Sequence, residues 1–362
     1  MTHPSALLDP FARARAIRAC GRLLSAALLC GFLAATSSCG TSDTEAALPP
    51  GGPDDTKLVI AATTGMVADL ARNIAGDRAT VVSLIDPGVD PHLYKPTRSD
   101  IGRIMDADLV LYNGLLLEGQ MVDAFARAAE AGKPVVAVAE SLDPAVLLSP
   151  DAFEDQNDPH VWMDPAAWVE TIGVVQAALA DADPAGAEVF EQNAASYTGE
   201  ILVIDAYAER VLATVPEERR VLVTAHDAFN YFGERFGFEV VGIQGISTES
   251  EAGVRDIERI VSLLVDRAIP AVFIESTVTD RNVEALLAGA RARGVDAVIG
   301  GELYSDAMGP SGTYTGTYLG MIDHNVTTIT RALGGEAPAG GAAGRLADRA
   351  EQSAAPADEP AG

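Results

Sequence analysis

Cysteine is scarce in this 362-residue chain, and so are basic side chains. The three cysteines are Cys20, Cys30 and Cys39, so no later residue can form a disulfide or supply a thiolate to a metal ion. Lysine and arginine together number 25 against 52 aspartates and glutamates, which gives a formal net charge of −27. Because such a surface repels phosphate backbones, nucleic acid is excluded as a partner.

The apolar run near the N-terminus is too short for a transmembrane helix. It covers residues 23–35 and follows four arginines that lie between residues 13 and 22. A helix that spans a bilayer needs about 20 apolar residues. Basic residues, a short apolar run and small residues in this order are instead typical of a secretory signal peptide. We therefore predict that residues 1–38 are a signal peptide.

Cys39 follows small residues and resembles the cleavage site of a bacterial lipoprotein, in which the cysteine becomes the lipidated first residue. Thr36 departs from the leucine that is usual three residues before the cysteine. The alternative is a plain secretory signal with Cys39 unmodified. Removal of the signal peptide takes away four arginines and one aspartate, which changes the net charge from −27 to −30. We expect a lipid anchor on Cys39 and a location on the outer face of the bacterial cytoplasmic membrane.

Residues 39–56 are rich in glycine, proline, serine and acidic side chains, which predicts a flexible tether. From residue 57 predicted strands alternate with amphipathic helices. The strands cover residues 58–62, 80–85, 109–112 and 134–138 in the first half and 220–225, 238–243, 271–275 and 297–299 in the second. This alternation predicts an α/β fold with parallel sheets. We place an N-terminal α/β lobe at 57–183 and a C-terminal α/β lobe at 215–333.

One long helix is predicted between the two lobes, at residues 184–214. It begins at Pro184, and its apolar side chains recur at spacings of four and three residues from Tyr197 to Val211. At 1.5 Å per residue it would be roughly 45 Å long and would act as a rigid spine. The alternative is two shorter helices with a break near Gly199. Residues 334–362 are mostly alanine, glycine, proline and charged residues, which predicts a disordered tail.

Three of the five histidines lie in similar settings. His92 and His160 each end an Asp-Pro-His sequence, and His226 directly follows a predicted strand. Together with Asp306, which follows the last predicted strand, His92 and His226 lie beyond carboxyl ends of strands, where parallel sheets bind ligands. The distances along the chain match no local metal motif, and each histidine taken singly could be a structural residue. Taken together, the four residues favour a shared metal site.

Three imidazoles and one carboxylate suit zinc, manganese or iron, whereas calcium and magnesium prefer shells of oxygen alone. Glu275 ends a predicted strand and is a candidate for orienting one of the imidazoles. A role in capping a helix or at the rim of the site is the alternative for Glu275. His324 lies off the apolar face of the last predicted helix, so we expect it at the surface. Trp162 is expected to pack beside the site.

Several motifs resemble those of the zinc/manganese solute-binding lipoproteins of metal-ion ABC importers, and they occur in the same order. They lie at residues 88–94, 112–119, 158–164, 245–253 and 303–306. The resemblance covers about residues 57–333. It implies two α/β lobes joined by one long helix, with a metal ion held between them by His92, His160, His226 and Asp306. It also implies an ABC permease in the membrane as the partner of a monomeric binding protein.

Two departures from the family pattern bear on the site. Lys95 stands where many members have an acidic residue, at a position that contacts no ligand. Histidine rather than glutamate at position 226 favours zinc over a manganese-restricted site. The chain lacks the histidine-rich loop of many zinc-specific members, since residues 151–158 are acidic. Zn²⁺ is therefore the first expectation for the cargo and Mn²⁺ the second.

Two other functional classes fit the sequence less well. A metallohydrolase keeps an open metal position for water and needs a general base nearby. Four protein ligands would close that position, and the sequence contains no His-Glu-x-x-His motif. A siderophore- or cobalamin-binding protein shares the plan with one long helix but has no need of three histidines and an aspartate. We therefore expect a transport protein and not an enzyme.

Overall fold

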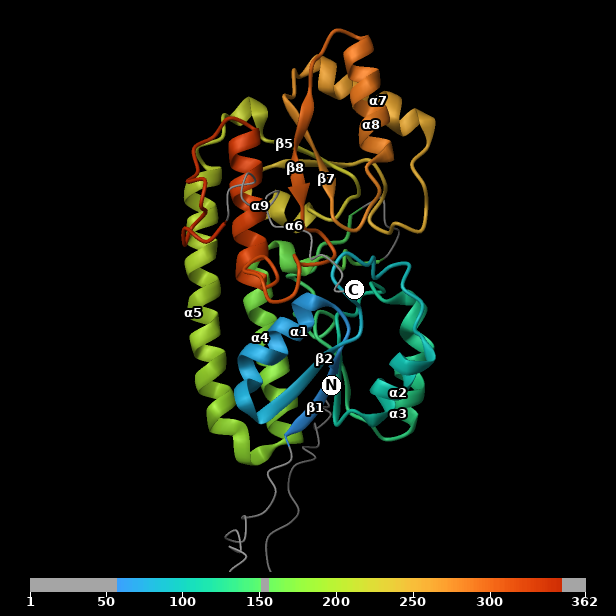
Figure 1. The fold of residues 1–362 in the computed structure, drawn as a ribbon, viewed down its shortest axis with the longest axis vertical. Coiled ribbons are helices and arrows are strands. Elements are labelled where there is room, and N and C mark those ends of the chain that lie inside the picture. The colour runs from blue at the N-terminus through green and yellow to red at the C-terminus, as the bar shows by residue number, and fades with distance from the viewer. Residues whose placement is uncertain (1–56, 151–155, 347–362) are drawn as a thin grey trace, which may run out of the picture. The chain divides into compact units, whose positions relative to one another are not determined.

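The computed structural model describes residues 57–150 and 156–346 (Figure 1). The predicted signal peptide, Cys39, the tether at 39–56 and the last part of the tail, residues 347–362, lie outside the described residues. Within the described part of the chain, no helix combines the length and the apolar character that a membrane crossing requires.

The N-terminal lobe is built on a four-stranded parallel sheet with the order β2-β1-β3-β4. Its strands are β1 (Leu58–Ala62), β2 (Ala79–Ser83), β3 (Leu109–Tyr112) and β4 (Val135–Ala137). The helices between them are α1 (Gly65–Ala75), α2 (Arg98–Asp106) and α3 (Val122–Glu130). The side chain of Thr64 caps the N-terminus of α1, and Thr97 forms a capping box with Asp100 at the start of α2. These caps fix the residues at which α1 and α2 begin.

The C-terminal lobe contains two parallel strand pairs. One pair joins β5 (Val221–Thr224) to β6 (Glu239–Gly242), and the other joins β7 (Ala271–Glu275) to β8 (Val298–Leu303). Strands β5 and β7 are in contact. The helices of this lobe are α6 (Asn230–Phe236), α7 (Val254–Asp266), α8 (Arg281–Ala292) and α9 (Tyr318–Ala332). Strand β8 runs with its carboxyl end toward the N-terminal lobe, and β7 is parallel to it (Figure 1).

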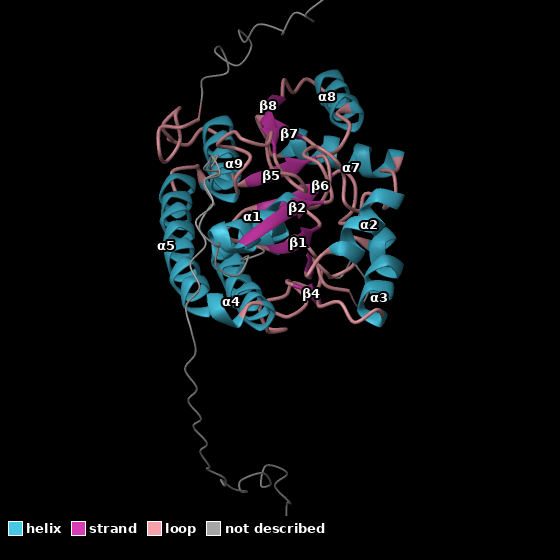
Figure 2. Ribbon diagram, turned by 60° about the horizontal axis from the view of Figure 1, so that its bottom comes forward, coloured by secondary structure: helices cyan, strands magenta, loops and turns pink. Residues whose placement is uncertain are grey.

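The long helix is present as α5 (Ala187–Leu212), preceded by a short 3₁₀ turn, η5 (Pro184–Gly186). It has 26 residues and continues through Gly199, so it is one helix and not two. At 1.5 Å per residue its length is about 39 Å. It contacts α4 (Pro165–Ala182), α1 and α9, and thus elements of both lobes (Figures 1 and 2). The predicted fold of two α/β lobes with one long connecting helix is confirmed.

The two lobes also share a core. A single apolar cluster includes side chains from both lobes and from the long helices, among them Trp168, Tyr197, Phe229 and Met321. Figure 2 shows the strands between one group of helices that contains α1, α4, α5 and α9 and another that contains α2, α3 and α7. Because this cluster contains side chains of both lobes, the lobes are held together by packing as well as by the chain.

The first part of the tail differs from the expectation of disorder. Residues 334–346 pack back onto α5 and α9, where Glu336 N–H donates to Thr214 Oγ1 at 2.7 Å and Ala342 N–H donates to Asp323 Oδ1 at 2.9 Å. Gly341 has φ +72°, and an added Cβ there would lie 2.4 Å from Asp323 Oδ1. The segment is ordered by backbone amides that bind the Thr214 hydroxyl and the buried carboxylate of Asp323, and composition alone does not reveal such contacts.

Candidate metal centre

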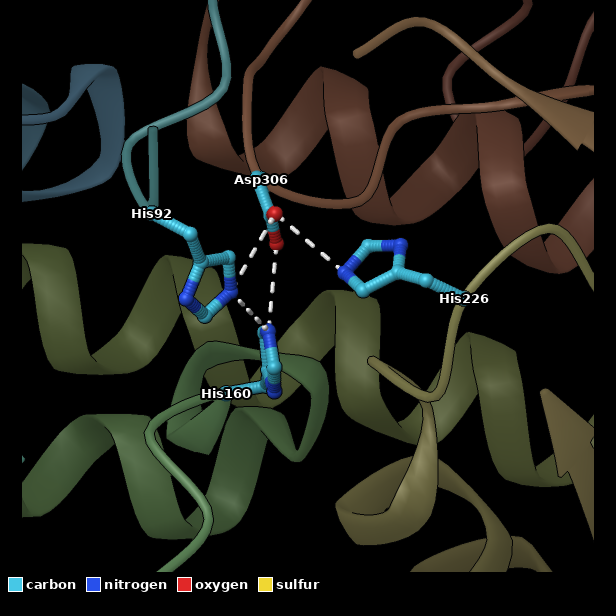
Figure 3. A group of neighbouring side chains, drawn as sticks. All are labelled: His92, His160, His226 and Asp306. Atoms are coloured by element: carbon cyan, nitrogen blue, oxygen red, sulfur yellow. Dashed lines mark hydrogen bonds and ion pairs between the residues drawn. The ribbon is translucent and has the colours of Figure 1, made fainter. Parts of the chain in front are cut away.

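Four side chains from four separate loops meet between the lobes (Figure 3). His92 lies in the loop between β2 and α2, and His160 immediately precedes the 3₁₀ turn η4 (Val161–Met163). His226 follows β5, and Asp306 follows β8. Each lobe thus supplies two of the four residues. The parallel direction of the strands brings three of these loops to one cleft, as the sequence predicted.

The four potential ligand atoms lie within 4.8 Å of one another. The Nε2 atoms of His160 and His226 are each 3.2 Å from an oxygen of Asp306. His92 Nε2 lies 3.4 Å from His160 Nε2 and 3.6 Å from Asp306 Oδ2. Ligands bound tetrahedrally at about 2.0–2.1 Å are about 3.3 Å apart, so these spacings fit a single transition-metal ion.

The cluster is buried and poorly satisfied by hydrogen bonds. His160 and His226 are 0% exposed, Asp306 is 2% exposed and His92 is 4% exposed. Among residues 57–150 and 156–346, nothing forms a hydrogen bond with His226 Nε2 or with either carboxylate oxygen of Asp306. Buried polar atoms are nearly always hydrogen-bonded, so a group of such atoms that converge on one point indicates a ligand. Nitrogen and carboxylate donors of this kind fit a divalent cation.

Two of the three imidazoles are oriented by carboxylates. His226 donates from Nδ1 to Glu275 Oε2 at 2.5 Å, and its backbone N–H donates to Glu275 Oε1 at 2.8 Å. His160 donates from Nδ1 to Asp158 Oδ1 at 2.7 Å, and its backbone N–H donates to the same oxygen at 2.9 Å. Both contacts leave the Nε2 lone pair of the imidazole facing the cluster.

Asp158 is a residue whose role the sequence reasoning missed. It is completely buried, and its second oxygen accepts a hydrogen bond from Asn230 Nδ2 at 3.0 Å. In the two Asp-Pro-His sequences, the sequence analysis assigns a role to the histidines alone. An aspartate two residues before a histidine can accept a bond from that histidine's backbone N–H, and this was the available signal. Glu275, which the sequence offered as one candidate for orienting an imidazole, contacts His226.

The charges around the cluster shift its pKa values in opposite directions. Burial lowers the pKa of His92 to about 3. Burial would also lower the pKa of His160, but Asp158 and Asp306 raise it to about 9. Burial opposes ionisation of Asp306, yet His226 and His160 hold its pKa well below the usual range. A bound cation would take the place of protons on the imidazoles, because ligating nitrogens must be unprotonated.

The remaining candidates have supporting or separate positions. Trp162 is fully buried, its ring edge meets His160 at a centroid distance of 5.2 Å, and its Nε1 donates to the Ser305 carbonyl at 2.9 Å. It therefore packs between the loops that carry His160 and Asp306. His324 lies outside the cluster on α9, where its Nε2 is 2.9 Å from the Glu302 carbonyl oxygen.

Residues 60–332 match the family described as zinc-uptake complex component A, periplasmic. The chain belongs to this family. The match covers both lobes, the long helix and all four residues of the cluster. The family resemblance that the sequence motifs indicated is thereby confirmed.

Two curated relatives of the chain are named for different metals. It is 44% identical over 311 residues to the manganese-binding lipoprotein MntA of Bacillus subtilis, with 86% of this chain and 98% of that protein covered. It is 42% identical over 316 residues to the zinc-binding protein TroA of Treponema pallidum, with 87% of this chain and 98% of that protein covered. The solved structure of the periplasmic zinc-binding protein TroA superposes with a TM-score of 0.74 at 44% identity, over 76% of this chain and 99% of TroA.

Proposed function

We propose that this protein is the extracytoplasmic metal-binding component of an ABC importer, and that its cargo ion is held by His92, His160, His226 and Asp306. The observation that carries the proposal is the convergence of these four buried ligand atoms within 4.8 Å. The orientation of two imidazoles by Asp158 and Glu275 supports the same roles. Membership of a family of periplasmic zinc-uptake proteins is consistent with them.

The ligand set is suited to holding an ion without reacting. Four protein ligands complete a tetrahedral shell and leave no position for an activated water. The two lobes each contribute two ligands, so full coordination requires that the lobes are in contact. A binding protein can use this division of the ligands. Separation of the lobes at the permease would lower the affinity for the metal ion and so release it.

Zinc is the favoured cargo and manganese the second. Three imidazoles and one carboxylate form a shell that zinc accepts readily, and zinc exceeds manganese in affinity for most nitrogen sites. The relatives include one named as manganese-binding and one named as zinc-binding, both above 40% identity. In this chain, the histidine at position 226 is the feature that favours zinc over manganese.

The proposal includes an anchor and a partner. Cys39 would carry the lipid that holds the mature protein on the outer face of the cytoplasmic membrane, with residues 39–56 as its tether. The ABC permease in that membrane would receive the ion from a monomeric binding protein. Relatives named as lipoproteins, among them MntA of Bacillus subtilis, support the anchor.

The decisive experiment is metal analysis of the protein purified without added metal, followed by competition between zinc and manganese. We expect one equivalent of a transition metal per chain and displacement of manganese by equimolar zinc. Absence of binding to both ions at micromolar concentration would refute the proposed function. Stronger retention of manganese than of zinc would leave the function intact and reverse the order of the two metals.

A further inference from the structure

His92 is held differently from the other two imidazoles of the cluster. His160 and His226 each donate from Nδ1 to a buried carboxylate, whereas no described residue provides such an acceptor for Nδ1 of His92. The side chain of His92 is therefore oriented mainly through its backbone. The backbone N–H of His92 donates to Asp90 Oδ1 at 2.8 Å. A change in the position of Asp90 would therefore change the position of His92.

Asp90 also connects the two lobes. Its second oxygen, Oδ2, accepts a hydrogen bond of 2.6 Å from Thr248 Oγ1, a residue 158 positions later in the chain. Asp90 is half-buried, and Thr248 is only 7% exposed. A hydrogen bond to an ionised carboxylate at such a site is short and strong. One carboxylate therefore joins a ligand of the N-terminal lobe to a loop of the C-terminal lobe.

The loop that carries Thr248 lies between β6 and α7. Its residues Gly245, Glu249 and Ser250 are exposed, while the side chain of Thr248 is turned inward to the cleft. A second contact between the lobes comes from the same loop, where Gln120 Nε2 donates to Glu249 Oε1 at 3.1 Å. Both partners of this second bond are exposed, and neither touches a residue of the cluster. The Gln120–Glu249 bond thus joins the lobes without affecting a ligand, whereas the Thr248–Asp90 bond joins the lobes and also reaches the residue that holds His92.

We infer that Thr248, acting through Asp90, is a positioning residue that keeps His92 in the ligand set and couples separation of the lobes to release of the metal ion. This inference rests on the proposed function. While the lobes are in contact, the Thr248 hydroxyl fixes Asp90, and Asp90 fixes the backbone of His92. Once the lobes part, His92 is the ligand without an anchor of its own and leaves the ion first. The other two imidazoles stay oriented by Asp158 and Glu275.

The test is the dissociation rate of zinc, measured by stopped-flow transfer to a chromophoric chelator. Thr248→Val keeps the shape of the side chain and removes the hydroxyl, so we expect zinc to dissociate about tenfold faster. Thr248→Ser restores the hydroxyl and is expected to release zinc at close to the rate of the parent. The association rate should change by less than about twofold in both variants.

Two controls distinguish the positioning of His92 from a general weakening of the contact between the lobes. Gln120→Leu removes the exposed contact of the same loop and is expected to leave the dissociation rate unchanged. Thr248→Val added to Asp90→Ala should cause no further acceleration, because the two residues act in series.

The inference is overturned if Thr248→Val releases zinc at the rate of the parent, if Gln120→Leu accelerates release equally, or if the double variant is additive. Failure of the parent protein to bind zinc at all would instead refute the proposed function.

Discussion

The carboxylate of Glu275 accepts two hydrogen bonds from one residue, His226, with one oxygen bound to the backbone N–H at 2.8 Å and the other to imidazole Nδ1 at 2.5 Å. Residue 275 ends β7 and residue 226 follows β5, so this pair joins the two strand pairs of the C-terminal lobe. The position and tautomer of His226 are thereby fixed before an ion arrives.

Glu275→Gln should weaken zinc binding by about 10–100-fold. An amide has one acceptor oxygen, so one of the two N–H groups of His226 would face an NH₂ group. Chelator competition at equilibrium measures the loss. Glu284→Gln, on the exposed side of α8, is the matched control and should bind as the parent does. Equal affinity of the two variants would contradict the orienting role.

Single alanine substitutions of the four cluster residues should abolish the stabilisation that zinc confers. Binding stabilises the fold by roughly 4 kcal/mol when free metal exceeds the dissociation constant a thousandfold. Melting temperatures with and without zinc measure this difference for each variant. His324→Ala should keep the full rise, because His324 lies outside the cluster. Any one of the four variants that retains the rise of the parent removes its residue from the ligand set.

Cys39→Ser should release the protein from the membrane fraction of cells that express the full chain. A serine cannot accept the thioether-linked lipid, and a single lost anchor is enough to free a soluble domain. Fractionation and mass spectrometry of residue 39 provide the readout. Membrane association that persists without lipid on residue 39 of the parent would refute the lipoprotein assignment.

Removal of residues 335–362 should lower the free energy of unfolding by about 2 kcal/mol. The buried carboxylate of Asp323 would lose the backbone N–H of Ala342, and Thr214 would lose the N–H of Glu336. Urea denaturation of the metal-free protein measures the change. Removal of 347–362 alone leaves these contacts in place and should have little effect. Equal stability of the two truncated chains would show that the contacts contribute nothing.

The ion pair between Arg78 and Asp183 should make stability depend on pH in the acid range. The guanidinium donates to Asp183 Oδ2 at 2.6 Å and lowers the pKa of that carboxyl below its usual value. A carboxyl with a lowered folded pKa contributes stability above its unfolded pKa of about 3.9, and the contribution is lost as pH falls through the folded value.

Arg78→Met should therefore cost no more than about 1 kcal/mol at pH 7, because the pair is partly exposed and screened by water. The difference from the parent should shrink toward zero as the pH falls below about 3.9. Denaturation curves at several pH values test this. In an Asp183→Asn background, the pH-dependent part of the Arg78→Met effect should be smaller than in the parent. A stability difference between Arg78→Met and the parent that stays constant with pH would show that the ion pair with Asp183 does not cause it.

The sequence determined the fold class and the residue types of the cluster. The alternation of strands and helices dictates parallel sheets, and the apolar stripe from Tyr197 to Val211 indicates a helix, whose continuation through Gly199 the structure shows. The placement of His226 and Asp306 directly after strands follows from the same pattern, since the carboxyl ends of parallel strands lie at one edge. These are local signals, so sequence alone was sufficient to read them.

Helices α4 and α6 were not predicted from the sequence. Helix α4 lies against α1, α5 and β3, so it is buried along much of its surface and shows no clean polar face. Helix α6 has seven residues, too few to display a helical period. Short or enclosed helices are fixed by the elements around them, and their own pattern is weak.

Only the tertiary structure decided which polar groups hold the ligands in place. Asp90 and Thr248 are 158 residues apart, and nothing in either local sequence marks them as partners. The same is true of Asp158 and Asn230, and of Asp323 and the backbone amide of Ala342. A hydrogen bond is directional and works over about 3 Å, so it depends on the final packing of distant segments. Hydrophobic periodicity records which face of an element is buried, but not which atom it will meet there.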